Sequence, residues 1–153
     1  MKELPHTRSC FVCGESNPLG LKLRFEEDSG TVKTHFTPRT EHGGFKAVTH
    51  GGLLATVLDE IMVWACAVRT KRFAYCAELG VRYLSPAQPG VELTGTARLE
   101  EDRRGRVFRA SAQLVDPAGT VVATATGKYL PLKKAAARVM AEDFVGDVEG
   151  LFD

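Results

Sequence analysis

The segment from Thr49 to Glu60 holds most of the residues whose types and spacing could do chemistry. Gly51 and Gly52 open an apolar stretch with helical spacing, and glycine lets a ligand approach the backbone closely because it has no Cβ. The first N–H groups of a helix lack intrahelical acceptors, and the macrodipole makes that end electropositive. The two glycines therefore indicate a site for an oxyanion or a polarised carbonyl. The alternative is a crowded turn that they merely relieve, with Thr49 as the N-cap.

Two carboxylates, Asp59 and Glu60, follow inside a run that is otherwise apolar. Burying a carboxylate without a partner is costly, so such a residue is usually paired, protonated or functional, and we expect its pKa to be raised. Neighbouring helix residues project about 100° apart, so the two side chains cannot point the same way. A capped or salt-bridged helix acid remains the alternative interpretation for either residue.

His50 and Asp59 lie nine positions apart and fall on opposite faces of the expected helix. They cannot form a dyad within one subunit. If a carbonyl bound at Gly51 is to meet a carboxylate, that Asp59 must come from a second copy of the chain. The spacing thus predicts that the site requires a dimer.

The four cysteines are Cys10, Cys13, Cys66 and Cys76. Cys10 and Cys13 form a CxxC, and together with His6 they could supply three zinc ligands. A single CxxC without a second pair is a weak metal signal, so we expect a tight turn with two reduced thiols and no metal. Cys66 and Cys76 are most simply small core residues.

The elements that must position these groups can be outlined from periodicity. Residues 50–70 follow helical spacing and are apolar nearly all round, which predicts a buried helix of about 30 Å. Alternation with a period of two predicts strands at 19–25, 32–36, 73–83, 91–99, 108–114 and 121–129. We expect an antiparallel sheet covered by one helix, in a domain spanning 19–132, preceded by an irregular lead-in at 1–18 and followed by a partly helical tail at 133–153.

Composition excludes several function classes. The 153 residues are 44% hydrophobic and 25% charged, with a net charge of +1, so the field that draws a protein onto nucleic acid is missing. The longest apolar run, 61–68, is far short of the roughly 20 residues of a membrane span. The first residues lack an export signal, so we expect a cytoplasmic protein. Common nucleotide, serine-hydrolase and zinc-protease motifs do not occur in the sequence.

Taken together, the motifs show a family resemblance. They are CFVCG at 10–14, NPLGL at 17–21, HGG at 50–52, LDE at 58–60 and VRYLSP at 81–86. In this combination the chain resembles the hot-dog thioesterases of the phenylacetate-pathway (PaaI-like) branch, over about residues 10–130. The histidine-glycine-glycine motif with an acid nine residues after the histidine is the most specific part.

The resemblance implies an α+β hot-dog fold, in which a curved antiparallel sheet of five to six strands wraps one long central helix. It also implies an acyl-CoA thioesterase that needs no cofactor and works as a homodimer or a dimer of dimers. The thioester carbonyl would bind at the Gly51 N–H, and Asp59 of the facing subunit would act as nucleophile or as general base. His50 would hold the helix start, and Glu60 matches a branch variant with a second acid. The expected substrate-binding residues are Gly52, His42, Gly44 and Thr56.

One position departs from the family pattern. Many relatives carry an asparagine six residues before the motif histidine, where this chain has Gly44. His42 is a candidate substitute, and the backbone is another. The departure leaves open an alternative function, a hot-dog protein that binds acyl-CoA without cleaving it. A hot-dog dehydratase or hydratase is ranked last, because a histidine at a helix start does not reproduce its catalytic arrangement.

Overall fold

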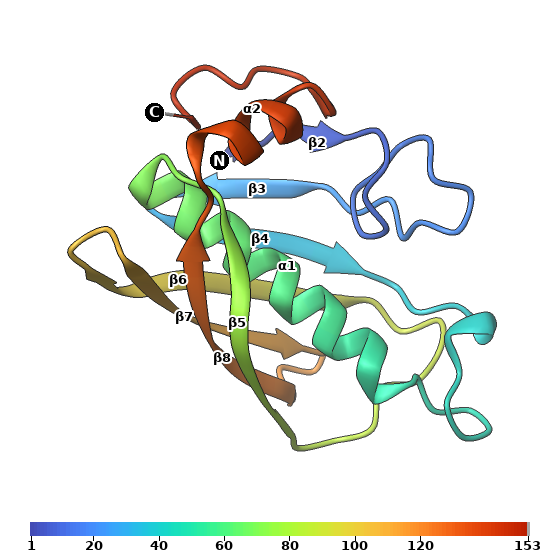
Figure 1. The fold of residues 1–153 in the computed structure, drawn as a ribbon. Coiled ribbons are helices and arrows are strands. Elements are labelled where there is room, and N and C mark those ends of the chain that lie inside the picture. Colours follow the sequence, from blue (N-terminus) through green and yellow to red (C-terminus); the bar gives the residue numbers. More distant parts are fainter. Residues whose placement is uncertain (153) are drawn as a thin grey trace.

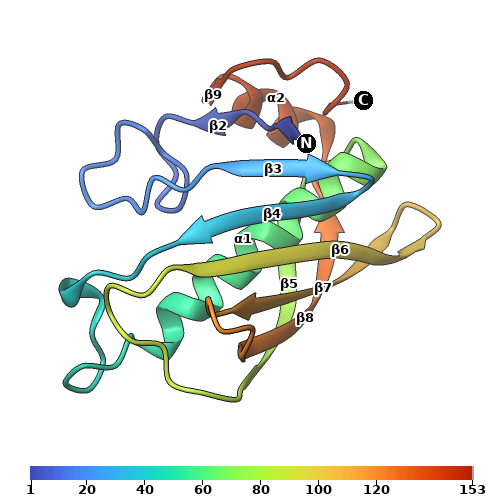
Figure 2. The same cartoon turned by 180° about the vertical axis from the view of Figure 1, so that it is seen from behind.

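One long helix, α1 (Gly51–Thr70), lies in the concavity of a curved antiparallel sheet in the computed structural model, which describes residues 1–152 (Figure 1). The sheet has the order β1-β3-β4-β6-β7-β8-β5. Its strands are β1 (Lys2–Glu3), β3 (Phe25–Asp28), β4 (Thr31–Phe36), β5 (Ala74–Tyr83), β6 (Leu93–Arg103), β7 (Val107–Val115) and β8 (Val121–Pro131). Seen from behind, strands β4 and β6 pass in front of the helix and cover it (Figure 2). This confirms the expected hot-dog fold, with seven strands rather than five to six because the two-residue β1 extends one edge.

The core forms where α1 packs on the inner face of the sheet. Nine helix residues are buried, among them Trp64, whose ring packs on Phe25 and Phe73 with centroids 5.4 Å and 5.2 Å away. By length and hydropathy alone α1 could cross a membrane, but half of its apolar window is buried inside the domain, as in a core helix. One side of the helix is not fully buried. Its residues follow i, i+4, i+7 spacing and are Gly52, Thr56 and Asp59. The helix therefore keeps one partly open side.

The alternating segment at 19–25 was expected to be a strand, and that prediction was wrong for most of its length. Regular pairing starts only at Phe25, opposite Thr34. Lys22 has a φ of 54°, in the left-handed region, which interrupts an extended strand. Residues 21 and 23 instead donate backbone hydrogen bonds to the carbonyls of Phe11 and Val12, so this segment pairs with the lead-in.

The lead-in and the tail pack on each other. The two-residue strands β2 (His6–Thr7) and β9 (Phe144–Val145) pair, and between β8 and β9 the tail forms α2 (Lys134–Ala141). Phe144 lies 5.3 Å from Phe73 between ring centroids, and Leu151 is buried. Phe144 and Leu151 of the tail are thus part of the hydrophobic core.

Strand β5 forms one edge of the sheet, pairing only with β8. It has a bulge between Cys76 and Glu78, and eight of its ten residues are exposed. Leu79 and Tyr83, on the side that faces α1, remain 36% and 50% exposed. A long edge strand with exposed apolar side chains is a template for pairing with another strand.

Candidate functional site

The helix start is built around His50 and two glycines. His50, not Thr49, is the N-cap of α1, and its Nδ1 accepts a hydrogen bond of 2.9 Å from the Gly52 N–H. The His50 N–H donates to the carbonyl of His42 at 2.8 Å, which ties the preceding loop to the helix. Gly51 N–H finds no acceptor within residues 1–152, whereas the Gly52 N–H is already used. The free electropositive donor at this helix end is therefore that of Gly51.

A cavity of about 640 Å³ opens beside this donor. Its walls come from the loop before α1, the helix start and the segment after β5, and they are mainly apolar. The lining residues are Gly44, Phe45, Val48, Thr49, His50, Gly51, Leu54, Tyr83, Leu84, Ser85, Pro86 and Ala87. The Thr49 hydroxyl is buried and has no hydrogen-bond partner among the described residues. The cavity thus combines an apolar wall with a few polar groups, as small-molecule sites do.

Tyr83 closes the cavity over the helix start. Its hydroxyl donates a 2.7 Å hydrogen bond to the carbonyl of Gly51. A Cβ at Gly51 would lie 3.2 Å from the Tyr83 ring, so the absence of a side chain there is what allows the ring to approach. The sequence placed Tyr83 in a family motif but gave it no role; only the fold brings the end of β5 to the start of α1.

Gly44 packs against the cap. A Cβ at this position would lie 3.2 Å from the His50 Cα, closer than side chains normally come to backbone. The loop carrying Gly44 therefore lies too near His50 to take an asparagine without moving. Its N–H donates to the carbonyl of Val48 at 2.9 Å, which closes the loop in this position.

The other expected substrate-binding residues lie on a second side of the helix start. A shallow groove of about 360 Å³ is lined by His42, Gly52 and Thr56 together with His50. Thr56 is turned back on its own helix, its hydroxyl donating to the Gly52 carbonyl at 3.0 Å. Of the four expected substrate-binding residues, Gly44 therefore lines the cavity at Gly51. The other three, His42, Gly52 and Thr56, line the separate groove.

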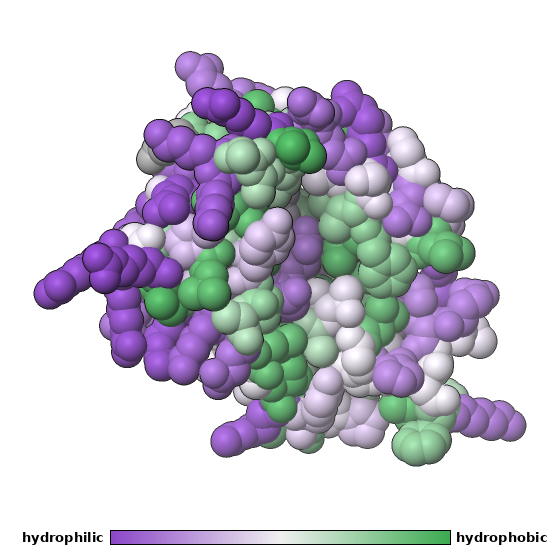
Figure 3. All heavy atoms as spheres, viewed as in Figure 1, coloured by the Kyte–Doolittle hydropathy of each residue, from purple (hydrophilic) through white to green (hydrophobic). Residues whose placement is uncertain are grey.

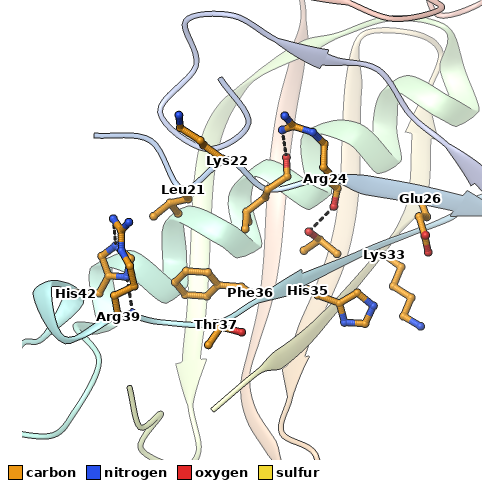
Figure 4. A pocket seen from close by; sticks show the side chains of 12 residues that line it. Leu21, Lys22, Arg24, Glu26, Lys33, His35, Phe36, Thr37, Arg39 and His42 are labelled. Carbon is orange, nitrogen blue, oxygen red and sulfur yellow. Dashed lines mark hydrogen bonds between the residues drawn. The ribbon is translucent and has the colours of Figure 1, made fainter. Parts of the chain in front are cut away.

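His42 points away from the cavity beside Gly51. Its side chain packs near Phe36, and its Nδ1 accepts a 2.9 Å hydrogen bond from the Arg39 N–H, in the basic groove of Figure 4. Burial, and then the nearby Arg39 charge, lower the pKa of His42, which favours a neutral ring. His42 therefore contributes to the site through its carbonyl, which accepts from the His50 N–H.

Asp59 is held by a tyrosine from the sheet. The Tyr129 hydroxyl on β8 donates to Asp59 Oδ1 at 2.8 Å, and Cys76 on β5 lies beside the same carboxylate. Burial, and then the Asp59 charge, raise the pKa of Tyr129 far above its usual value, so this hydroxyl stays a donor. Asp59 is only partly buried and lies next to the open edge strand β5.

Glu60 points to a different part of the molecule. Its Oε1 lies 3.8 Å from Cys10 Sγ and 3.9 Å from Cys13 Sγ, under the N-terminal lead-in. Burial raises the pKa of Glu60 to about 8, which agrees with the expected raised pKa for a carboxylate in this run. Thus the two carboxylates diverge, Asp59 toward β5 and Glu60 toward the lead-in.

Asp59 and Gly51 of one chain do not share a cavity. Asp59 is eight residues further along α1, a rise of about 12 Å, and is not among the residues lining the cavity at Gly51. A ligand held at the Gly51 N–H therefore cannot reach the Asp59 of the same chain without spanning two helical turns.

Comparison with known proteins supports the fold. The family model described as the thioesterase superfamily matches residues 47–123, the helix and the strands after it. Among curated proteins no sequence matches this chain significantly.

Solved structures with the same fold include three informative ones. The thioesterase superfamily protein RHA08564 is 25% identical with a TM-score of 0.73, and the match covers 80% of this chain but only 63% of that protein. The E. coli PaaI protein from the phenylacetic acid degradation operon is 21% identical with a TM-score of 0.68, covering 74% of this chain and 81% of PaaI. Smu.793 from Streptococcus mutans UA159, solved bound to acetyl CoA, is 19% identical with a TM-score of 0.67, covering 73% and 90%.

The family match spans just over half of the sequence and contains the helix start, Asp59 and the edge strand β5. The structural neighbours have the same helix-in-sheet arrangement, which confirms the expected hot-dog architecture. The chain belongs to the thioesterase superfamily.

Proposed function

We propose that this protein hydrolyses an acyl-coenzyme A thioester to a free acid and coenzyme A, at a site shared between two copies of the chain. The observation that carries the proposal is the Gly51 N–H, which lies at the positive end of α1, beside an apolar cavity, without an acceptor in the described part of the chain. A single preorganised donor of this kind contributes about 10²- to 10³-fold to the rate of acyl transfer.

The open edge of the sheet supports the shared site. When two β5 strands pair antiparallel about Gly80, Tyr83 of one chain lies opposite position 77 of its partner, within the bulge between Cys76 and Glu78. Tyr83 covers Gly51, and Cys76 lies beside Asp59. Such pairing therefore brings the partner subunit's Asp59 toward the Gly51 N–H of the first chain, and the two-fold axis repeats the site.

The pairing also covers exposed apolar surface. In Figure 3, hydrophobic side chains gather around a central hollow and below it, in the region where Figure 1 places β5 and α1. The exposed apolar residues of this edge are Tyr75, Leu79, Tyr83 and Leu84. Burying them against a second copy removes an edge that would otherwise favour uncontrolled association.

The chemistry needs few groups. The thioester carbonyl oxygen accepts from Gly51 N–H, and the partner's Asp59 either removes a proton from a water that attacks the carbonyl carbon or attacks that carbon itself. The carbon–sulfur bond then breaks and coenzyme A leaves as a thiolate, which needs no strong general acid. When Asp59 attacks, water cleaves the resulting anhydride in a second step. Both routes consume one water and give one acid and one thiol.

The ligand class is supported by relatives. One structural neighbour, Smu.793, was solved with acetyl CoA, and a Streptococcus pneumoniae protein with the same fold was solved with coenzyme A. In this chain the apolar wall beside Gly51 provides space for the acyl group or for the pantetheine arm.

Release of free thiol from a panel of acyl-CoAs tests the proposal. We expect the wild-type chain to release thiol, and Asp59→Asn, which keeps the side-chain shape, to lose about 10²-fold or more of that rate while binding is retained. Calorimetric binding of acyl-CoA by the wild-type chain with no thiol release across the panel would instead favour the non-catalytic binding protein.

The Gly51 donor can be tested with a matched pair of variants. Gly51→Ala and Gly51→Pro both add a Cβ near Tyr83, but only proline removes the N–H. Proline is favoured at the first helical position, and His50 before it has an extended ψ of 128° that tolerates a following proline. We expect kcat to fall by about 10²- to 10³-fold more in the proline variant. Equal rates in the two variants would remove the Gly51 N–H from the mechanism.

A further inference from the structure

A cluster of two thiols and a carboxylate lies under the N-terminal lead-in, away from the cavity at Gly51. Cys10 Sγ, Cys13 Sγ and a Glu60 carboxylate oxygen all lie within 4.8 Å of one another. His6, which the sequence grouped with the two cysteines, instead bonds Glu15 at 2.8 Å. The third group of this cluster comes from α1, 47 positions after Cys13.

The spacing of the three atoms suits a tetrahedral metal. With Zn–S near 2.3 Å and Zn–O near 2.0–2.2 Å, a sulfur and an oxygen on the same zinc lie roughly 3.5–3.7 Å apart. The Glu60 oxygen lies 3.8 Å from Cys10 Sγ and 3.9 Å from Cys13 Sγ. Both sulfur–oxygen distances are therefore within a few tenths of an ångström of those around one zinc ion.

The backbone around Cys10 is arranged to support a thiolate. The Val12 N–H donates to Cys10 Sγ at 3.3 Å, and the Gly14 N–H donates to the Cys10 carbonyl at 2.8 Å, which closes the turn. A Cβ at Gly14 would lie 2.2 Å from that carbonyl oxygen, so only glycine fits this turn.

The cluster has no cation to balance it. Glu60 is partly buried. Its polar contacts in the described part of the chain are the two thiols and the side chain of Trp64, and it forms no ion pair with Lys or Arg. Arg24 reaches only the back of the loop, donating to the Cys13 carbonyl at 3.2 Å. A buried carboxylate between two thiols is costly unless protonated or bound to a cation, and a divalent ion supplies that balance.

We infer that Cys10, Cys13 and Glu60 form a binding site for a thiophilic divalent cation, zinc above all. Zinc prefers thiolate and carboxylate ligands in tetrahedral sites, and a solvent molecule completes the fourth position beside the part-exposed Cys10. The ion links Cys10 and Cys13 of the lead-in to Glu60 of α1, the residue next to Asp59. The inference does not depend on thioesterase activity, because metal binding is measured without any acyl-CoA.

Metal content after chelation and reconstitution tests the site. The full-length protein is stripped with a chelator, given zinc alone, passed through gel filtration and analysed for metal and protein. We expect about one zinc per chain, and with Co²⁺ a thiolate-to-cobalt absorption band together with the visible bands of a tetrahedral ion. No stoichiometric metal and no such band would overturn the inference.

Variants assign the ligands. Loss of an outer-shell partner typically weakens metal binding 10- to 100-fold, so Cys10→Ser, Cys13→Ser and Glu60→Gln should each weaken zinc binding by at least about 100-fold in competition with a chromophoric chelator. Glu60→Gln is a neutral isostere, so a folded variant without zinc is expected. Cys76→Ser, which removes an exposed thiol elsewhere, is the control and should retain the ion. Wild-type affinity in Glu60→Gln would overturn the three-ligand site.

The redox alternative gives a different result. If Cys10 and Cys13 were instead a redox pair, intact mass measurement of protein purified without reductant would show the loss of two hydrogens, and zinc would not prevent it. We expect four free thiols in the denatured protein, with zinc slowing alkylation of Cys10 and Cys13 but not of Cys76. A disulfide that forms equally with and without zinc would overturn the metal site.

Discussion

Tyr129 donates a 2.8 Å hydrogen bond to Asp59 Oδ1, joining β8 to the carboxylate 70 positions earlier in the chain. Hydrogen bonds to charged groups contribute about 1.5–3 kcal/mol, enough to select one orientation of this side chain. The same hydroxyl lies 3.3 Å from the Asp59 carbonyl. Asp59 is thus held toward the open edge of the sheet rather than free in solvent.

Removing that hydroxyl should impair turnover more than substrate binding. In Tyr129→Phe the ring still fills the core while Asp59 loses its donor, so we expect kcat to fall roughly 10-fold with KM nearly unchanged. Steady-state kinetics on an acyl-CoA cleaved by the wild type measure both values. A rise in KM with an unaltered kcat would argue that Tyr129 shapes the substrate site and does not position Asp59.

Gly127 provides the space that Tyr129 occupies. A Cβ there would lie 2.6 Å from the Tyr129 ring, and Gly127 sits on the same face of β8. Gly127→Ala should therefore displace the ring, costing about 1–3 kcal/mol of unfolding free energy and reducing kcat as Tyr129→Phe does. Urea unfolding and kinetics on the same sample test this.

The double variant separates the two effects of Gly127→Ala. If the alanine acts through the Asp59–Tyr129 hydrogen bond, adding Tyr129→Phe should lower kcat no further. Independent, multiplicative losses of kcat would show that Gly127 acts by another route.

The exposed edge of β5 should be what holds two chains together. Leu79→Lys places a charge on that edge at a side chain already 36% exposed, so the single chain should fold while the dimer dissociates. We expect sedimentation to show monomers and thiol release to fall by about 10²-fold or more, because the partner's carboxylate is lost.

A matched control is available on α2. Val139 is 69% exposed and lies on α2, outside the sheet, so Val139→Lys makes the same kind of change on another element. It should keep both the oligomeric state and the rate. A Leu79→Lys protein that stays dimeric and active would place the interface elsewhere.

Much of the fold follows from periodicity, because residues buried against one face repeat at the spacing of their element. Residues 50–70 and the strands after them obey this rule, and α1 and β5 to β8 lie where it predicts. The rule failed at 19–24. The alternation of apolar and polar residues there predicts a strand and does not indicate the positive φ of Lys22 or the pairing with the lead-in.

Less of the candidate site than of the fold could be predicted from the sequence. Gly51 and Asp59 could be proposed as site residues because local spacing describes a helix start and its faces, and the family resemblance added His50. Tyr83 and Tyr129 were missed as site residues because their contacts with Gly51 and Asp59 depend on how the sheet curves around α1. The third member of the Cys10–Cys13 cluster was missed for the same reason, because Glu60 reaches it from the helix.

Mixing two inactive variants tests the shared site most directly. Asp59→Asn chains keep an intact Gly51 N–H, and Gly51→Pro chains keep an intact Asp59, so a mixed dimer contains one complete site. After subunit exchange at equal concentrations, with mixed dimers verified by differential tags, we predict recovery of about a quarter of the wild-type thiol-release rate. Mixed dimers that stay as inactive as either parent would contradict a carboxylate from one chain acting on a thioester held by the other.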